Sequence, residues 1–272
     1  MKIVRFRDDA GGIHWGIPES DTAARLLTGT PFDPSFAVTP HIRVCRELLA
    51  PAIPPNIYCI GKNYADHARE TGSAVPERPV VFMKPTSAIQ SPNKAIRLPV
   101  VAIEKPGVDF EGELAVIIGK VALDVPEHDA LQYVLGYTCA NDVSARWWQS
   151  HAGGGQWIRG KGFDTFCPLG PVLVTSDDIP NPQDLAISTT VNGERMQNDS
   201  TRNMVFPVAE LISYLSQGTT LLPGTVILTG TPSGVGFARH PPVFLQPGDD
   251  VVVTIEGIGS LKNHVLTAEP VD

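Results

Sequence analysis

Short apolar runs, separated by turns rich in Gly and Pro, recur along most of the chain. Residues 2–7 and 13–17 alternate between apolar and polar side chains on the two sides of a turn at residues 9–12, which predicts a β-hairpin. Residues 225–228 and 251–255 are apolar runs of the kind found in buried strands. These patterns indicate a chain built mainly from strands.

Two further patterns predict a second hairpin and one helix. Asn192 and Gly193 form the pair that favours the type I′ turn of a two-residue hairpin loop. Residues 207–215 carry apolar side chains at the i, i+3, i+4, i+7 spacing of an amphipathic helix, and Gly218 is a suitable stop. Long helices are scarce, and the 25 Pro and 25 Gly suit many short strands. The predicted fold class is α+β, predominantly β, with short helices.

A cluster of prolines divides the chain. Pro51, Pro54 and Pro55 stiffen one short stretch and are typical of a linker. We therefore expect a small N-terminal β-rich domain with its linker over residues 1–55 and a larger domain over residues 56–272. A chain of 272 residues is long enough for this arrangement.

Composition narrows the partners and the compartment. The formal charge of −8 and the pI near 5.3 argue against binding to nucleic acid or to an anionic membrane. No apolar run of about eighteen residues occurs, and residues 1–7 alternate like a strand instead of forming a signal-peptide core. We expect a soluble cytoplasmic protein, or a mitochondrial one if the chain is the mature form of a eukaryotic protein. Its four widely spaced cysteines are expected to be reduced.

Acidic residues stand at Asp109, Glu111 and Glu113, directly before the apolar run 114–118, which predicts a buried strand that includes them. In a strand, alternate side chains share one face, so these carboxylates would lie together and repel one another unless a cation sat between them. Asp142, further along the chain, is a candidate to close such a site. The alternative explanation is an edge strand with a solvated acidic face.

The ligand chemistry narrows the metal. Carboxylate sites suit hard cations, and neither His nor Cys flanks this stretch, so Mg²⁺ or Mn²⁺ is favoured, with Ca²⁺ as an alternative. A calcium-binding EF-hand loop is excluded, because its required Gly and Glu would fall on Leu114 and Lys120.

A predicted helix over residues 63–72 offers a candidate base. We expect Asn63 to cap this helix and Gly72 to end it. His67 and Glu70 then lie three residues apart on one face, where the carboxylate can orient the imidazole as a water-activating base. An exposed helix with a local His/Glu pair is the alternative. Asp66 and Arg69, on the same helix, are expected to face solvent, and residues 73–79 have the composition of a mobile loop that could form a lid.

Three further polar positions are candidates for contact with a substrate. Residues 141–149 begin with cap-type residues and are predicted to continue as a helix, which would place Asp142, Arg146 and Gln149 on a common face. A structural salt bridge for Arg146 and a helix-surface amide for Gln149 are the alternatives. Thr231, in a Gly- and Thr-rich segment after a predicted strand, could offer its hydroxyl to a substrate carboxylate.

Lys161 stands between Gly160 and Gly162, which permit close backbone approach. A lysine confined near carboxylates can stabilise an enolate or oxyanion. The alternative is a solvated loop lysine.

Taken together, these segments resemble the fumarylacetoacetate hydrolase superfamily, and most closely the type-2 branch of the fumarylacetoacetate hydrolase domain-containing proteins. The similarity runs from about Ile57 to the C-terminus and rests on several segments in the same order along the chain. These segments are residues 61–70, 82–85, 109–113, 141–149, 161–171 and 229–236.

The resemblance implies a mixed β-roll catalytic domain and usually a homodimer. It implies Mg²⁺ or Mn²⁺ held by Glu111, Glu113 and Asp142. It also implies a lid carrying the catalytic residues His67 and Glu70, a catalytic Lys161, and substrate-facing positions at Arg146, Gln149 and Thr231. Asp109 is not among the usual ligands of the family, so we assign it a role in the structure or in supporting the ligands from behind.

The activity that the resemblance favours is hydrolytic cleavage of a carbon–carbon bond in a small anionic 2-oxo acid of the acylpyruvate or fumarylpyruvate type. The alternative is enol–keto tautomerisation or decarboxylation of oxaloacetate, or a related isomerase or decarboxylase reaction of aromatic catabolism, which would use the same residues. A metal-stabilised dimeric binding module is the non-enzymatic alternative.

Overall fold

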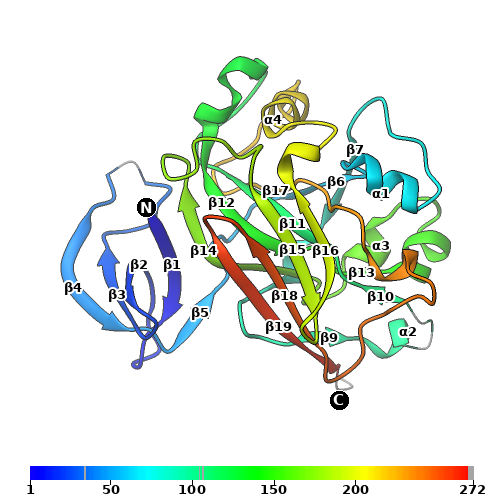
Figure 1. The fold of residues 1–272 in the computed structure, drawn as a ribbon. Helices are drawn as coiled ribbons and strands as arrows, with labels where there is room; N and C mark the ends of the chain where they lie inside the picture. The colour runs from blue at the N-terminus through cyan, green and yellow to red at the C-terminus, as the bar shows by residue number, and fades with distance from the viewer. Residues whose placement is uncertain (34, 104, 106, 269–272) are drawn as a thin grey trace.

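The structure is a computed structural model that describes residues 1–33, 35–103, 105 and 107–268. It consists mainly of strands, as predicted (Figure 1). The strands are β1 (Lys2–Arg7), β2 (Ile13–Ser20), β3 (Ala23–Leu27), β4 (Val38–Val44), β5 (Glu47–Leu49), β6 (Ile57–Gly61), β7 (Val80–Lys84), β8 (Ile89–Gln90), β9 (Ile96–Leu98), β10 (Val108–Asp109), β11 (Gly112–Ile118), β12 (Val134–Asn141), β13 (Ser144–Ala145), β14 (Cys167–Thr175), β15 (Ala186–Val191), β16 (Glu194–Ser200), β17 (Val226–Leu228), β18 (Asp250–Ile255) and β19 (Gly259–Thr267).

The helices are short, and the longest α-helix among the residues that the structure describes has nine residues. Among the described residues, no helix has the length and apolar character needed to cross a bilayer. The α-helices are α1 (Ala65–Glu70), α2 (Val100–Ile103), α3 (Ile158–Lys161) and α4 (Val208–Ser216). The other helical turns are η1 (Thr86–Ala88), η2 (Glu127–Tyr133), η3 (Trp148–Ala152), η4 (Thr201–Asn203) and η5 (Gly236–Ala238).

Two large sheets form the body of the molecule. The first has twelve strands in the main order β4-β3-β2-β1-β14-β12-β11-β17-β6-β7, with β5 beside β1 and β8 beside β14. The second has five strands in the order β16-β15-β18-β19-β9, and a separate small ladder joins β10 to β13. Most pairs are antiparallel, whereas β17 with β6, β14 with β8 and β19 with β9 run parallel, so the sheets are mixed.

Strand β11 lies at the centre of the core, and all seven of its residues are buried. Its alternate side chains enter different apolar clusters. Leu114 and Val116 pack in a cluster that includes Val253 of β18, whereas Ala115 and Ile117 pack in a cluster on the other side of the sheet. Burial on both faces explains why residues 114–118 are uninterruptedly apolar.

The local predictions for both hairpins and for the helix are confirmed. Strands β1 and β2 pair across the turn at residues 9–12, and β15 and β16 join through Asn192 and Gly193 at φ 52° and 81°. Helix α4 buries its predicted apolar stripe, and Gly218, just beyond its end, has φ +60°. All four cysteines are free thiols, of which Cys45 alone is only half-buried.

The N-terminal strands share a ladder with the larger part of the chain. Figure 1 shows β1 to β4 at one side of the molecule. Strand β1 pairs with β2 and β5, and it also pairs through Lys2 and Ile3 with β14. Beyond the prolines, β6 begins at Ile57. The division at residue 55 stays a prediction, and the shared ladder would give the two parts a fixed relative position.

Candidate active site

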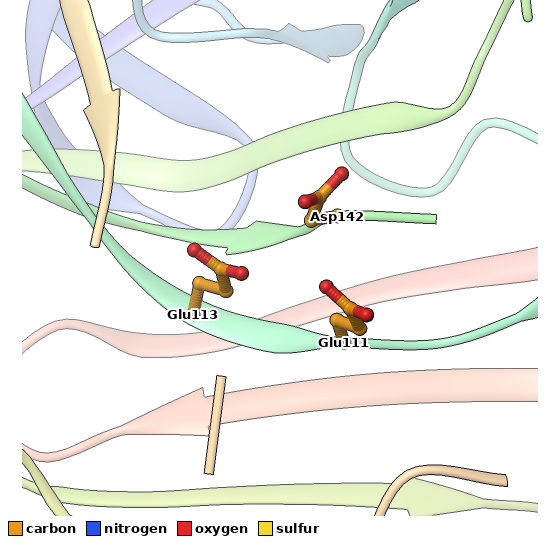
Figure 2. A group of neighbouring side chains, drawn as sticks. All are labelled: Glu111, Glu113 and Asp142. Atoms are coloured by element: carbon orange, nitrogen blue, oxygen red, sulfur yellow. The ribbon is translucent and has the colours of Figure 1, made fainter. Parts of the chain in front are cut away.

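Three buried carboxylates gather where β11 and β12 meet. Gly112 of β11 is in register with Asn141, the last residue of β12, so the flanking residues Glu111, Glu113 and Asp142 become neighbours. One ligand atom from each lies within 4.8 Å of the others, and Figure 2 shows the three carboxylates around a common space. The backbone fixes this approach, because the Asp142 amide donates to the Glu111 carbonyl at 2.8 Å.

Asp109 does not belong to this cluster. The expectation of one continuous strand through residues 109–113 is wrong, because β10 ends at Asp109 and β11 begins at Gly112. The Asp109 carboxylate instead accepts hydrogen bonds from the backbone amides of Gly236 (2.8 Å) and Phe237 (3.0 Å) and from the Arg146 guanidinium. These contacts agree with the structural role expected for Asp109. The alternative of an exposed acidic face is wrong, since Asp109, Glu111 and Glu113 are all buried.

Two buried lysines contact the carboxylates. Lys161, the last residue of α3, donates to Glu111 Oε2 at 2.7 Å and to Asp142 Oδ2 at 2.6 Å. Lys84, the last residue of β7, donates to Asp142 Oδ1 at 2.5 Å and to the Val143 carbonyl at 3.1 Å. Lys161 is only 2% exposed, so the alternative of a solvated loop lysine is wrong. Lys84 was not among the predicted site residues, although it lies in the segment 82–85 that carries part of the family resemblance.

The carboxylates differ in their electrostatics. Burial, with Asp142 and Glu111 close by, raises the pKa of Glu113 well above its usual value. The pKa of Glu111 is held below its usual value. Burial alone would raise it, but the positive charges of Lys161 and Arg146 outweigh the effect of burial. Burial lowers the pKa of Lys161, and the Asp142 and Glu111 carboxylates more than compensate, so the ammonium keeps its charge.

This arrangement fits a hard divalent cation. The donor set is all oxygen, which suits Mg²⁺ or Mn²⁺ and also Ca²⁺. Glu113 has no ion-pair partner within the described residues, and its Oε2 accepts only the Gly230 amide at 2.6 Å. An unpaired buried carboxylate beside two others is costly, and a cation shared by the three would remove that cost.

His67, which is buried, and Glu70, which is partly exposed, form a pair on α1. His67 Nδ1 lies 2.8 Å from Glu70 Oε1, and Glu70 Oε2 accepts the Gly234 amide at 2.8 Å. The exposed-helix alternative is wrong, because His67 is 7% exposed. Because the Glu70 carboxylate only accepts, Nδ1 must donate, and the lone pair of the neutral imidazole resides on Nε2. Asp66 and Arg69 form an exposed ion pair, as expected.

Asn63 does not cap this helix, contrary to the prediction. Helix α1 begins at Ala65, and the residue before it, Tyr64, makes no side-chain cap. The Asn63 amide donates to the carbonyls of Phe206 (3.0 Å) and Thr229 (2.7 Å) and accepts the Phe206 amide at 2.8 Å. One side chain thereby satisfies three buried backbone groups, which stabilises more than a single cap bond would.

The predicted helix over residues 141–149 is wrong in its first half. Asn141 ends β12 and Ser144–Ala145 form β13, which pairs with β10, so helical structure starts only at Arg146. Asp142 therefore reaches the site from a strand end. The ladder with β10 explains the difference, because its hydrogen bonds outweigh a local helical preference.

Arg146 and Gln149 still lie together at the site. Arg146 donates to Glu111 Oε1 at 2.6 Å and to Gln149 Oε1 at 3.2 Å, and its Nε and Nη2 both donate to Asp109 Oδ2, at 2.9 and 2.8 Å. These charges raise the pKa of Arg146 in spite of its burial. The structural salt bridge that was the alternative for Arg146 is therefore present, whereas Gln149 faces the site.

Thr231 lies beyond β17, with its hydroxyl already bonded on both sides. It donates to the Gly112 carbonyl at 2.9 Å and accepts from Gln197 Nε2 at 2.7 Å. Gln197, a buried residue of β16, also accepts the Gly112 amide at 2.9 Å. No pattern in the sequence pointed to Gln197, because an amide in a polar strand normally faces solvent.

One cavity of about 200 Å³ unites the candidate residues. Seven of the nine lie in its wall, and the other two, Glu70 and Asp142, contact wall residues from behind. The wall also contains residues that the sequence analysis did not select. The complete lining is Ile60, Gly61, Lys62, His67, Thr71, Ser73, Phe82, Glu111, Glu113, Arg146, Gln149, Ser150, Trp157, Lys161, Thr231 and Phe237.

Comparison with known proteins places the chain in a family. Residues 56–266 match the family described as fumarylacetoacetate (FAA) hydrolase C-terminal, and residues 1–51 match the one described as Rv2993c-like, N-terminal. Oxaloacetate tautomerase FAHD2B, mitochondrial, from Bos taurus is 51% identical over 98% of this chain and 92% of its own length. Oxaloacetate tautomerase FAHD2A, mitochondrial, from Homo sapiens is 48% identical over the same shares.

A solved structure adds the fold. The crystal structure of 5-carboxymethyl-2-hydroxymuconate delta-isomerase from Mycobacterium smegmatis superposes with a TM-score of 0.85 at 40% identity, over 98% of this chain and all of that one. The predicted fold and the predicted resemblance are both confirmed. The chain belongs to the fumarylacetoacetate hydrolase superfamily of enzymes.

Proposed function

We propose that this protein is a divalent-metal-dependent tautomerase that interconverts the enol and keto forms of oxaloacetate. The names of two mammalian relatives at about half identity support this activity. Carbon–carbon hydrolysis, the activity favoured by the sequence analysis, has support only at the level of the superfamily. The observation that carries the proposal is the small cavity whose wall combines buried carboxylates, a buried ammonium and an oriented histidine.

The carboxylates of Glu111, Glu113 and Asp142 would hold the metal. Mg²⁺ or Mn²⁺, or alternatively Ca²⁺, would supply a Lewis acid for the 1-carboxylate and 2-oxygen of the substrate. The cavity is small, which suits a small anionic 2-oxo acid. Apolar side chains of Ile60, Phe82 and Phe237 also line it and would limit the access of water.

Tautomerisation requires one proton to leave the enol oxygen and one to reach C3. Nε2 of His67 carries the lone pair that accepts such a proton, and Glu70 stabilises the imidazolium that results. The Lys161 ammonium, held in place by Glu111 and Asp142, would stabilise the negative charge on the substrate oxygen. The imidazolium then returns its proton to C3, so atoms and charge balance.

Hydrolysis is the second candidate, because the same His67–Glu70 pair could activate a water molecule. A substrate panel separates the activities. Purified protein is incubated with oxaloacetate, acetylpyruvate and fumarylpyruvate, with Mg²⁺ or with a chelator, while the ultraviolet absorbance of the enol and the products are followed. We expect Mg²⁺-dependent loss of the oxaloacetate enol with oxaloacetate conserved. Release of pyruvate and CO₂ from oxaloacetate would indicate a decarboxylase. Release of pyruvate and a second carboxylic acid from acetylpyruvate or fumarylpyruvate would indicate a hydrolase.

Replacing His67 by Asn is expected to lower kcat about 10²- to 10⁴-fold, because the proton acceptor is lost. The thermal shift produced by Mg²⁺ should stay as in the wild type, since His67 is not among the proposed ligands. Enol-loss kinetics and differential scanning fluorimetry measure the two effects. His128→Asn is the matched control, because His128 is 81% exposed. An unchanged kcat in His67→Asn would remove the histidine from the mechanism.

The homodimer and the cytoplasmic location stay predictions. The two mammalian relatives carry the word mitochondrial in their names, so a mitochondrial location is the corresponding proposal for this chain. Size-exclusion chromatography with light scattering measures the oligomeric state.

A further inference from the structure

The cations in the cavity wall differ in how they are paired. Lys161 contacts Glu111 and Asp142, and Arg146 contacts Asp109 and Glu111. Lys62 lies in the same wall, but none of the carboxylates that the structure describes pairs with it. Its Nζ donates to Ser73 Oγ at 2.8 Å and lies 5.9 Å from the centre of the Trp157 ring. Lys62 is therefore the wall cation whose charge is left for a ligand.

The backbone holds Lys62 in a special conformation. Its φ of 57° lies in the left-handed region, which a residue with a side chain adopts only when its surroundings impose it. The Trp157 ring packs on the preceding residue so closely that any side chain at Gly61 would collide with it. Phe82 meets the same ring edge-on at 5.3 Å. Packing thus fixes the backbone at the point from which Lys62 enters the cavity wall.

Charge compensation shows what Lys62 could do. A 2-oxo acid would bind through its head group, which is the 1-carboxylate together with the 2-oxygen. This head group would lie at the carboxylate cluster, where Lys161 and Arg146 also lie. Lys161 and Arg146 already form ion pairs with carboxylates of the protein, so they are poor partners for a second carboxylate of the substrate. A free ammonium in a partly buried wall attracts such a group, and the Ser73 hydroxyl beside it can donate a further hydrogen bond.

We propose that Lys62 binds the distal carboxylate of the substrate and so makes the site selective for 2-oxo dicarboxylates over 2-oxo acids with an uncharged tail. This inference rests on the proposed function for the identity of the head group. It assigns Lys62 to specificity, with no part in the proton transfer.

The test measures binding, so that it does not depend on turnover. Mg²⁺-loaded protein is titrated calorimetrically with malate, 2-hydroxybutanoate and oxalate. Malate and 2-hydroxybutanoate share a four-carbon skeleton and differ in whether the tail ends in a carboxylate or a methyl group, whereas oxalate presents the head group alone. The wild type should bind malate about tenfold or more tightly than 2-hydroxybutanoate, as expected for one charged hydrogen bond.

In Lys62→Met, malate should bind only as tightly as 2-hydroxybutanoate, while oxalate stays within about twofold of its wild-type affinity. Lys62→Arg should retain most of the preference for malate, because the charge is kept. Lys120→Met is the control, since Lys120 is exposed and lies outside the cavity wall. Circular dichroism verifies that each variant is folded.

Three results would overturn the inference: a wild type that binds malate and 2-hydroxybutanoate equally, an unchanged preference in Lys62→Met, or an equal loss for all three ligands. The last would mean that Lys62 only shapes the cavity. Failure of the proposed function has a different signature. In that case the oxaloacetate enol would not be consumed, while the selective loss of malate binding in Lys62→Met would remain.

Discussion

Replacing Glu113 by Gln is expected to abolish metal-dependent activity, with a fall in kcat of about a thousandfold or more, because several kcal/mol of Lewis-acid stabilisation are lost. Of the three clustered carboxylates, Glu113 is the one that no lysine or arginine of the described chain contacts. Its charge is therefore the one that most needs a bound cation. Gln has the same shape and can still accept the Gly230 amide.

The Glu113→Gln variant also has an expected effect on stability that a general folding defect would not produce. Removing a buried charge next to Asp142 and Glu111 should leave the metal-free protein at least as stable as the wild type. Mg²⁺ should raise the Tm of the wild type and leave that of the variant unchanged. Differential scanning fluorimetry with and without chelator measures both effects, and Glu194→Gln serves as the control because Glu194 is 71% exposed. A full Mg²⁺ shift in Glu113→Gln would exclude Glu113 as a ligand.

Replacing Lys161 by Met is expected to lower kcat about 10²- to 10³-fold, the usual cost of removing one group that stabilises an oxyanion. The KM should change much less, because the negative charge on the 2-oxygen that Lys161 stabilises is present in the enolate and absent from the bound substrate. Enol-loss kinetics over a range of oxaloacetate concentrations separate the two parameters.

Metal binding distinguishes this role from a structural one. Lys161 contacts Glu111 and Asp142, two of the proposed ligands, at 2.7 and 2.6 Å. Its removal should leave Mg²⁺ affinity equal or tighter, since a competing positive charge is gone. Calorimetric titration with Mg²⁺ measures this, and Lys262→Met, which removes a lysine from an exposed ion pair, is the control. Loss of Mg²⁺ binding in Lys161→Met would show that the lysine organises the ligands instead of stabilising the enolate.

The sequence predicted those parts of the fold that local chemistry determines. The apolar run 114–118 is typical of a strand buried on both faces, and Asn192 with Gly193 can adopt the positive φ values of a tight hairpin. The stripe on α4 likewise depends on periodicity alone. These predictions hold because their causes lie within a few residues of one another.

The errors fall where a distant partner decides the local structure. Residues 144–145 pair with β10 and so form a strand instead of a helix, and Asn63 bonds to residues more than a hundred positions away. Glu111 and Glu113 were found because carboxylates next to an apolar run are conspicuous, whereas the ligand set with Asp142 in place of Asp109 was implied by the family resemblance. Lys62 and Lys84 were missed as site residues, because a lysine in sequence carries no sign of whether it is buried or what it contacts.

The three hydrogen bonds of Asn63 also bear on how a substrate enters. They tie the start of α1 to Phe206 and Thr229, and the bond from Gly234 to Glu70 ties its other end. A movement that carried His67 out of the cavity would break these bonds and expose their buried partners, at a cost of about 1–3 kcal/mol for each group left unsatisfied. Beyond Gly72, at φ +65°, residues 74, 75, 77 and 78 are exposed. Opening and closing of the cavity would therefore be a movement of residues 74–78. The His67–Glu70 pair would already be in place when a substrate enters.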